Sequence, residues 1–261
     1  MCRLAAYVGP SITLEQFLLN PPHGLLVQAW RPREMHHAAL GVDGFGLGWY
    51  GPDELPATYV NPMPIWSDVN LSSLSRSLSC DLWLTAVRSA TPGYVSSHAN
   101  LQPFSDEADL LFIHDGYITD FRRNLRPALR QFLDPAIEAD MEGNTDSEYL
   151  FALLRHLLAG DDDLSIEEAI AEMMRLLDDW LEEEIPALLN FVISDGERLY
   201  AVRHAVNADC PSLYYTTDDE TFPGGQLVAS ERLTETEYWQ PVPEHHILIL
   251  DAEEPPELLA L

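Results

Sequence analysis

Cys2 holds the position in this chain that says most about chemistry, because it directly follows the initiator Met1. Methionine is usually removed before a small second residue, and its removal would leave Cys2 with a free α-amino group. An α-amine has a pKa of about 7.7–8.0, so part of it is neutral near neutral pH and can take the proton from the thiol. A weak nucleophile beside an N-terminal amine base is a known arrangement for covalent catalysis. The alternative is a small apolar residue that opens a buried strand.

Two further segments carry groups that could bind a small charged molecule. Arg88 and Thr91 lie three residues apart after an apolar stretch. A guanidinium binds a carboxylate through two parallel hydrogen bonds, so this pair could hold one carboxylate; the alternative is a surface arginine beside a Pro-Gly turn. Asp146 lies in a Thr-Asp-Ser-Glu segment and could bind a ligand ammonium group. Its alternative role is an acid in the first turn of a helix, where the helix dipole favours negative charge.

A fourth segment, His114-Asp115-Gly116, follows the short apolar run at residues 110–113. We expect the strand to end there in a glycine turn. Backbone N–H groups in such a turn can point at a developing oxyanion. A plain Asp-Gly turn without a catalytic role is the alternative.

The elements that must position these residues are strands near the N-terminus and helices in the middle. Apolar stretches predict strands at residues 3–8, 41–50, 81–87 and 110–114. A short helix is expected at residues 12–19 and another at 122–133. Two longer helices are expected after segments with capping-box spacing, at Thr145 to Glu148 and at Ser165 to Glu168. After the second of these, apolar residues recur every three or four positions, as one helix face requires.

The C-terminal part returns to strands. Asp195-Gly196, between two apolar runs, predicts a tight hairpin. Further strands are expected at residues 213–217, 226–229 and 245–250, and residues 251–261 are rich in proline and glutamate and predict a loose tail. The order of strands, helices and strands, without a Gly- or Ser-rich linker, favours one α+β layered domain over residues 1–261.

Composition excludes several classes of function. The net charge is −29 and all 14 basic residues are arginine, so neither a lysine Schiff base nor a lysine phosphate-binding loop can form. This acidic excess repels nucleic acid and anionic lipid, and no apolar run reaches the length of a membrane span. Three scattered cysteines favour a reducing compartment, which makes the cytoplasm the expected location. The histidines show no metal-ligand spacing, and we expect neither a metal nor a cofactor.

Taken together and in order, these segments resemble the class II glutamine amidotransferases. That family combines an N-terminal Cys, Arg-x-x-Thr after a strand, an Asn-x-Pro-Phe-like segment, a His-Asn-Gly turn and a later Thr/Ser-Asp-x-Glu. The matching positions in this chain are Cys2, Arg88 with Thr91, residues 100–104, residues 114–116 and residues 145–148. Residues 21–26, 43–49 and 87–91 are most similar to stand-alone members of the ergothioneine pathway, which cleave the γ-glutamyl amide of a thiol-histidine metabolite. The resemblance implies a four-layer αββα sandwich of the N-terminal-nucleophile type.

The resemblance also implies a role for each residue. Cys2 would attack the γ-amide carbonyl, with its own amine as base, and form a γ-glutamyl thioester that water hydrolyses. Arg88 and Thr91 would hold the α-carboxylate of the glutamyl group, and Asp146 its α-ammonium. The Gly116 N–H would supply one hydrogen bond of the oxyanion hole.

Asp115 departs from the family pattern, in which an asparagine side chain donates the second hydrogen bond to the oxyanion. An ionised carboxylate has no donor and opposes a forming negative charge. Loss of one such donor can cost about 100- to 1,000-fold in rate. Three outcomes are open: a dry site keeps Asp115 protonated, a backbone group replaces it, or the chain is slow or inactive. We expect Asp115→Asn to raise the rate of hydrolysis.

The expected partner is a small γ-glutamyl compound, with a homo-oligomer or a separate synthase subunit left open. Two other functions remain as alternatives. One is a glutaminase subunit that supplies ammonia to a synthase. The other is a catalytically silent γ-glutamyl-binding protein, a consequence of Asp115.

Overall fold

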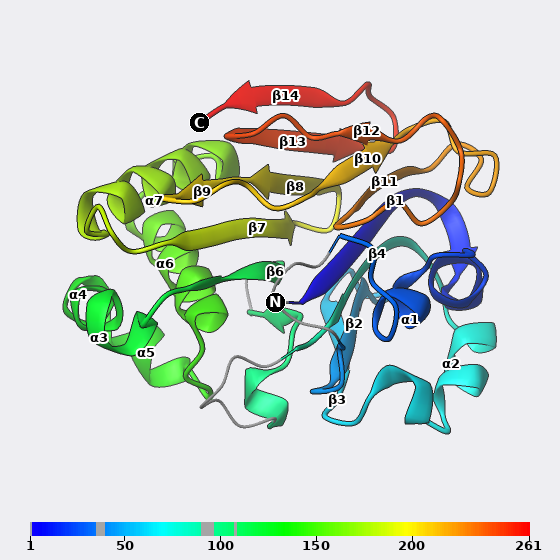
Figure 1. Ribbon diagram of the computed structural model, residues 1–261, viewed down its shortest axis with the longest axis horizontal. Helices are drawn as coiled ribbons and strands as arrows, with labels where there is room; N and C mark the ends of the chain where they lie inside the picture. Colours follow the sequence, from blue (N-terminus) through cyan, green and yellow to red (C-terminus); the bar gives the residue numbers. More distant parts are fainter. Residues whose placement is uncertain (1, 35–39, 90–96, 107–108) are drawn as a thin grey trace.

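Two antiparallel sheets lie face to face in the computed structural model, which describes residues 2–34, 40–89, 97–106 and 109–261 (Figure 1). The first sheet has the strand order β12 (Gln240–Pro241), β10 (Tyr214–Thr216), β11 (Gln226–Ala229), β1 (Arg3–Thr13), β4 (Ser79–Val87), β2 (Phe45–Tyr50) and β3 (Pro56–Asn61). The second has the order β14 (Glu257–Ala260), β13 (His246–Asp251), β8 (Arg198–Arg203), β7 (Ala187–Ser194), β6 (Leu111–Ile118) and β5 (Phe104–Ser105). A short strand, β9 (Ala205–Val206), also pairs with β7.

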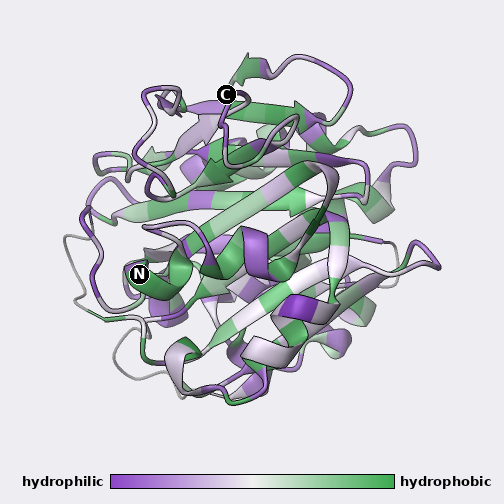
Figure 2. Cartoon of the chain, turned by 90° about the vertical axis from the view of Figure 1, so that its right-hand side faces the viewer, coloured by the Kyte–Doolittle hydropathy of each residue, from purple (hydrophilic) through white to green (hydrophobic). Residues whose placement is uncertain are grey.

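Apolar side chains fill the space between the two sheets. Alternate residues of each strand point into it, as the two-residue period of a strand requires. From β1 these are Leu4, Ala6 and Val8, and they belong to one buried cluster with Leu111 and Ile113 of β6. Figure 2 shows apolar strand segments inside the molecule and hydrophilic residues in many of the surface loops. This layer places the start of β1 next to β6 at the centre of the molecule (Figure 1).

Helices cover the outer faces of both sheets, which completes the four layers. The second sheet is covered by α6 (Asp146–Gly160) and α7 (Ile166–Trp180), with the shorter α3 (Phe121–Asn124), α4 (Arg126–Phe132) and α5 (Pro135–Asp140). The first sheet is covered by a π-helical turn (Glu15–Leu19), α1 (Leu25–Gln28) and α2 (Leu71–Ser77). Single turns of 3-10 helix lie at Ile65–Ser67 and His98–Asn100. The predicted α+β sandwich of αββα type is therefore confirmed.

Several predicted elements differ in detail. The helix expected at residues 122–133 is two short helices, α3 and α4, and residues 12–13 belong to β1 instead of a helix. Ser165 and Glu168 form the predicted reciprocal capping box. At the other predicted box, Thr145 accepts a hydrogen bond from the Glu148 N–H, but the Glu148 carboxylate turns to the N–H groups of residues 142 and 143. Backbone N–H groups in a partly buried loop need an acceptor, and here the Glu148 carboxylate is that acceptor. The reciprocal half of this capping box is therefore not formed.

The predicted loose tail is wrong. After Asp251 the chain turns back, and β14 pairs with β13 in register from Ile249↔Glu257 to His246↔Ala260. Leu259 and Leu261 pack against the core beneath the second sheet. Without β14, the backbone N–H and C=O groups on the outer edge of β13 would have no strand partner. Hydrogen bonds to this edge hold part of the segment in a strand despite its polar composition.

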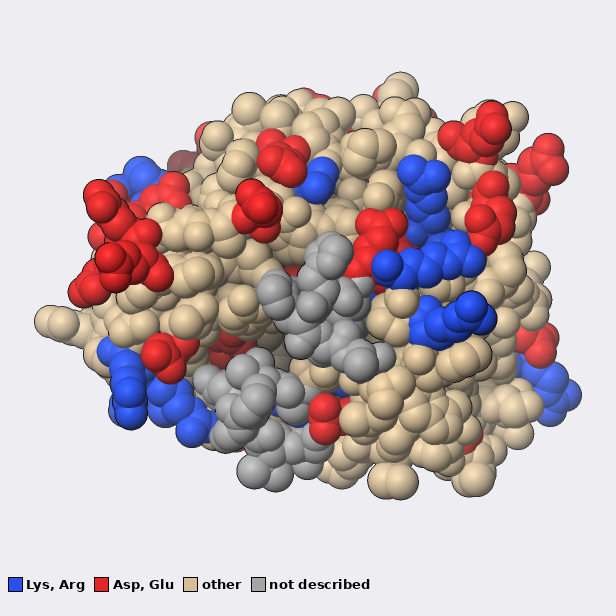
Figure 3. Space-filling view, in the orientation of Figure 1, with Lys and Arg blue, Asp and Glu red and all other residues tan. Residues whose placement is uncertain are grey.

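No helix among the described residues is long and apolar enough to cross a membrane. Figure 3 shows acidic side chains spread over the face of the molecule that it displays, with arginines in smaller groups. This distribution agrees with the net charge of −29.

Candidate active site

Antiparallel pairing of β1 with β4 brings Arg88 to Cys2. The register joins Arg3 to Val87, so the residues just outside the ladder, Cys2 and Arg88, are opposite one another. Both line a small cavity of about 30 Å³. The other residues that line it are Ser89, Asn100, Gln102, Gly116, Thr145, Asp146 and Ser147. The fold therefore gathers four of the six predicted site residues around one space, and the remaining two are Thr91 and Asp115.

Cys2 is almost fully enclosed, with 8% of its surface exposed. Burial raises the pKa of its thiol, while the charge of Arg88 and a hydrogen bond from the Ser89 backbone lower it. A thiol with a raised pKa needs a base next to it in order to act as a nucleophile at neutral pH. The position of Cys2 therefore fits activation by its own amine better than spontaneous ionisation.

Arg88 is the cation among the described residues that line this cavity. Its side chain is buried, and its Nη1 has no hydrogen-bond partner among the described residues. A buried guanidinium nitrogen without a partner is costly unless a ligand completes it. The arrangement is suited to a carboxylate that enters the cavity.

Asp146 supplies the negative charge on the same cavity. It is the first residue of α6, and two backbone N–H groups fix its carboxylate. Ile118 donates to Oδ2 at 2.8 Å, and Ser147 donates to Oδ1 at 3.0 Å. The fixed carboxylate can accept hydrogen bonds from an ammonium group, so Arg88 and Asp146 together match a ligand with one carboxylate and one ammonium.

The predicted glycine turn at residues 114–116 is wrong, because β6 continues through these residues to Ile118. Gly116 is needed there for a different reason. A Cβ atom at this position would lie 1.9 Å from the Leu188 carbonyl oxygen and 2.4 Å from His114 Nε2. The strand therefore passes its neighbours too closely for any side chain.

The hydrogen-bond pattern of β6 shows where the Gly116 N–H points. Backbone groups of alternate residues point to opposite edges of a strand. The N–H groups of His114 and Ile118 point away from β7. The first donates to the Gln102 side chain and the second to the Asp146 carboxylate. Gly116 lies between them with the same parity, so its N–H faces the same open edge, toward the cavity that contains Cys2.

His114 and Gln102 hold this part of β6 in place. His114 Nε2 donates to the Leu188 carbonyl at 3.0 Å, so its Nδ1 accepts from the Ser147 hydroxyl at 2.9 Å. Burial lowers the pKa of His114, which agrees with a neutral ring. The Gln102 amide also donates to the His114 carbonyl at 3.2 Å. Gln102 and Ser147 were not predicted as site residues, although both lie inside the segments singled out in the sequence.

Asp115 points away from the cavity and into a buried ion pair. Its Oδ2 lies 3.2 Å from Arg3 Nη2 and accepts a 2.7 Å hydrogen bond from the Ser230 hydroxyl. Both charged side chains are 1% exposed or less. Arg3 also contacts Glu231 at 3.5 Å, and its Nε donates to the Cys2 carbonyl at 2.7 Å. The carboxylate is therefore balanced by Arg3, the residue that follows Cys2.

Thr91 lies outside the described residues.

A larger cavity, of about 310 Å³, is lined by His98, Ala99 and Pro103 among others, but not by Cys2 or Arg88. The chemistry of the lining, and not its size, therefore identifies the site.

Comparison with known proteins agrees with this fold. The sequence pattern of the class-II glutamine amidotransferases matches residues 25–223. A structure of a glutamine aminotransferase class-II domain protein from Silicibacter pomeroyi shares 26% identity, covers 99% of both chains and has a TM-score of 0.69. A glutamine phosphoribosylpyrophosphate amidotransferase from B. subtilis shares the fold at 14% identity and a TM-score of 0.66, with 99% of this chain and 49% of that one covered. The chain belongs to the class-II glutamine amidotransferases, and the predicted family is confirmed.

Two curated relatives share a more specific name. A gamma-glutamyl-hercynylcysteine sulfoxide hydrolase of Mycolicibacterium smegmatis is 29% identical over 248 residues, which are 95% of each chain. A protein of the same name from Mycobacterium tuberculosis is 28% identical, over 95% of this chain and 92% of its own. The predicted class of enzyme, a hydrolase of γ-glutamyl amide bonds, agrees with these names.

Proposed function

We propose that this protein is an amidohydrolase that cleaves the γ-glutamyl amide bond of a thiol-histidine metabolite similar to γ-glutamyl-hercynylcysteine sulfoxide, and releases glutamate. One observation carries the proposal: the guanidinium of Arg88, whose Nη1 has no hydrogen-bond partner among the described residues, and the fixed carboxylate of Asp146 line the same cavity as the Cys2 thiol. These two charges match the α-carboxylate and α-ammonium of a glutamyl group. The names of the curated relatives support the choice of leaving amine.

The reaction uses Cys2 twice. The α-amine takes the thiol proton, and the sulfur attacks the γ-carbonyl carbon to form a tetrahedral oxyanion that the Gly116 N–H stabilises. The C–N bond breaks, and the departing amine takes the proton back from the α-ammonium. Water then attacks the carbonyl carbon of the γ-glutamyl thioester, and the amine takes its proton. The C–S bond breaks, glutamate is released, and the proton on the amine returns to the Cys2 sulfur.

The test compares two substrates side by side in untagged protein. We expect glutamate release from γ-glutamyl-hercynylcysteine sulfoxide with kcat/KM at least about tenfold above that for glutamine, which corresponds to about 1.4 kcal/mol. A preference for glutamine, with a copurifying synthase, would instead indicate an ammonia-supplying subunit. Binding of both compounds without turnover, in protein shown by mass spectrometry to have lost Met1, would indicate the silent binding protein.

The role of Arg88 predicts a loss of substrate affinity on substitution. Arg88→Met removes the cation but keeps most of the apolar stem, so we expect KM to rise by about 100-fold, the cost of two charge-assisted hydrogen bonds. Steady-state kinetics on the γ-glutamyl substrate measure the change. Arg130→Met, which removes an exposed arginine, serves as the matched control. An unchanged KM in Arg88→Met would contradict the assignment.

Substitution of Asp115 by asparagine is expected to raise the rate of hydrolysis and to lower the stability of the protein. Besides burial, the negative charge of Asp115 raises the pKa of the Cys2 thiol, and it also opposes a forming oxyanion. Asp115→Asn removes this charge, so we expect kcat per folded molecule to rise several-fold while the melting temperature falls, because Arg3 loses its closest carboxylate. Turnover corrected for the folded fraction, together with calorimetry, separates the two effects. Unchanged or lower turnover would contradict the proposed influence of Asp115.

A further inference from the structure

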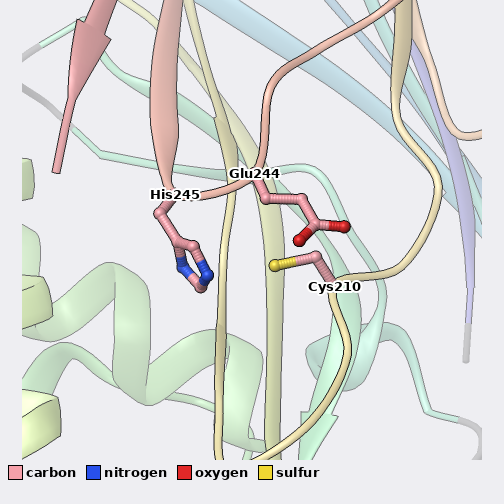
Figure 4. A group of neighbouring side chains, drawn as sticks. All are labelled: Cys210, Glu244 and His245. Atoms are coloured by element: carbon pink, nitrogen blue, oxygen red, sulfur yellow. The ribbon is translucent and has the colours of Figure 1, made fainter.

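Cys210, Glu244 and His245 form a cluster that the proposed reaction does not use. Cys210 lies in the loop after β9, and the other two residues immediately precede β13. One ligand atom of each residue lies within 4.8 Å of the others. Figure 4 shows the Cys210 sulfur between the Glu244 carboxylate and the edge of the His245 ring. None of the three lines the cavity that contains Cys2.

The three ligand types are those that Zn²⁺ binds in proteins. Zinc takes thiolate sulfur at about 2.3 Å, imidazole nitrogen at about 2.0–2.1 Å and carboxylate oxygen at about 2.0–2.2 Å, in tetrahedral geometry. Neighbouring ligand atoms are then roughly 3.3–3.6 Å apart. Glu244 is exposed, so a change of its side-chain rotamer can narrow the remaining gap without a backbone shift, while His245 keeps its contact with His204.

A second observation points to a ligand at His245. Its Nδ1 faces Nδ1 of His204 at 3.0 Å, and His204 is 7% exposed. The Asp178 carboxylate, 4.0 Å from His204 Nε2, favours the proton on that nitrogen. His204 Nδ1 then accepts, so His245 donates from Nδ1 and presents the lone pair of Nε2. Metal-binding histidines are typically oriented in this way, by a partner on the other ring nitrogen.

The charges of the cluster also suit a divalent cation. A thiolate and a carboxylate carry two negative charges, which a divalent ion balances. Arg203 Nη2 contacts Glu244 Oε1 at 3.4 Å, whereas its Nε and Nη1 donate shorter hydrogen bonds to the carbonyls of Pro211 and Val242, at 2.8 and 2.7 Å. The second carboxylate oxygen of Glu244 can therefore bind a metal while Arg203 stays in place.

We propose that Cys210, Glu244 and His245 bind a Zn²⁺ ion, with water completing the coordination. The ion would join the loop after β9 to the start of β13. The next residues of that loop, Pro211 and Ser212, accept hydrogen bonds from the Asn190 side chain, and Asn190 is paired with Asp115 across β7 and β6. The metal would therefore stabilise the support of the active-site strand without contributing to catalysis.

Binding of Co²⁺ and Zn²⁺ to the untagged protein tests the site. Co²⁺ should give a sulfur-to-cobalt charge-transfer band in the near ultraviolet, which Zn²⁺ removes on displacement. Saturating Zn²⁺ should raise the melting temperature by roughly 5 °C, because the ion binds only the folded chain. Cys210→Ser should lose the band, and the conservative Glu244→Gln should keep it with an affinity at least about tenfold lower.

Two cysteine variants serve as controls. Cys80→Ser and Cys2→Ala should retain the band, because neither residue belongs to the cluster. Persistence of the band in Cys210→Ser, its loss in Cys2→Ala, or Co²⁺ binding without a charge-transfer band would each overturn the proposal. If Cys210→Ser lowers stability in metal-free protein, the affinity change in Glu244→Gln decides the result.

Discussion

Substitution of Cys2 by alanine is expected to abolish glutamate release, with kcat lowered by about 10⁴-fold or more, as expected when a catalytic nucleophile is removed. The thiol lines the same cavity as the two charges that would hold the glutamyl group. Cys80→Ser, which removes a partly buried thiol elsewhere, should leave the rate unchanged. Glutamate release is measured by coupled assay, and binding of a γ-glutamyl compound shows that the variant is folded.

The α-amine that Cys2 would carry after removal of Met1 is tested separately from the thiol. A tag that cannot be removed, placed before Cys2, keeps the sulfur but converts the amine to an amide with no basicity. Because burial raises the pKa of the thiol, we expect this protein to lose nearly all activity, whereas the same tag at the C-terminus has no effect. Equal activity of the two tagged proteins would show that another group acts as the base.

The second large effect is on stability and concerns Arg3. Arg3→Met should lower the free energy of unfolding by about 3–5 kcal/mol, because it leaves the Asp115 carboxylate buried without its counter-charge. Glu231 is less affected, since His23 contacts it at 2.8 Å and two backbone N–H groups donate to it. Urea denaturation measures the change.

The double variant Arg3→Met/Asp115→Asn identifies the cause. It removes both charges of the closest pair, so we expect it to recover a large part of the stability that Arg3→Met loses. Arg175→Met breaks only exposed ion pairs and should cost less than about 1 kcal/mol. If the double variant is as unstable as Arg3→Met, loss of the contacts of the arginine stem, and not the unpaired charge, causes the effect.

Sequence patterns predicted those elements whose signals are local. The hairpin at Asp195-Gly196 is present, with Gly196 at a φ of +95°, and Ser165 caps α7 as expected. The errors occur where a distant segment overrides the local signal. Residues 114–116 resemble a turn, but pairing with β7 keeps them extended. The acidic C-terminal segment resembles a tail, but the open edge of β13 makes part of it a strand.

The sequence by itself determined the types of the candidate site groups and their order along the chain: a thiol at Cys2, a cation at Arg88 and a carboxylate at Asp146. Only the tertiary structure decided how these groups are arranged. It pairs Asp115 with Arg3 across the two sheets, directs the Gly116 N–H to the open edge of β6, and brings Cys210 to His245. Such contacts join residues far apart in the chain, and they form because the two sheets bury their apolar faces against each other. Local sequence patterns therefore could not predict them.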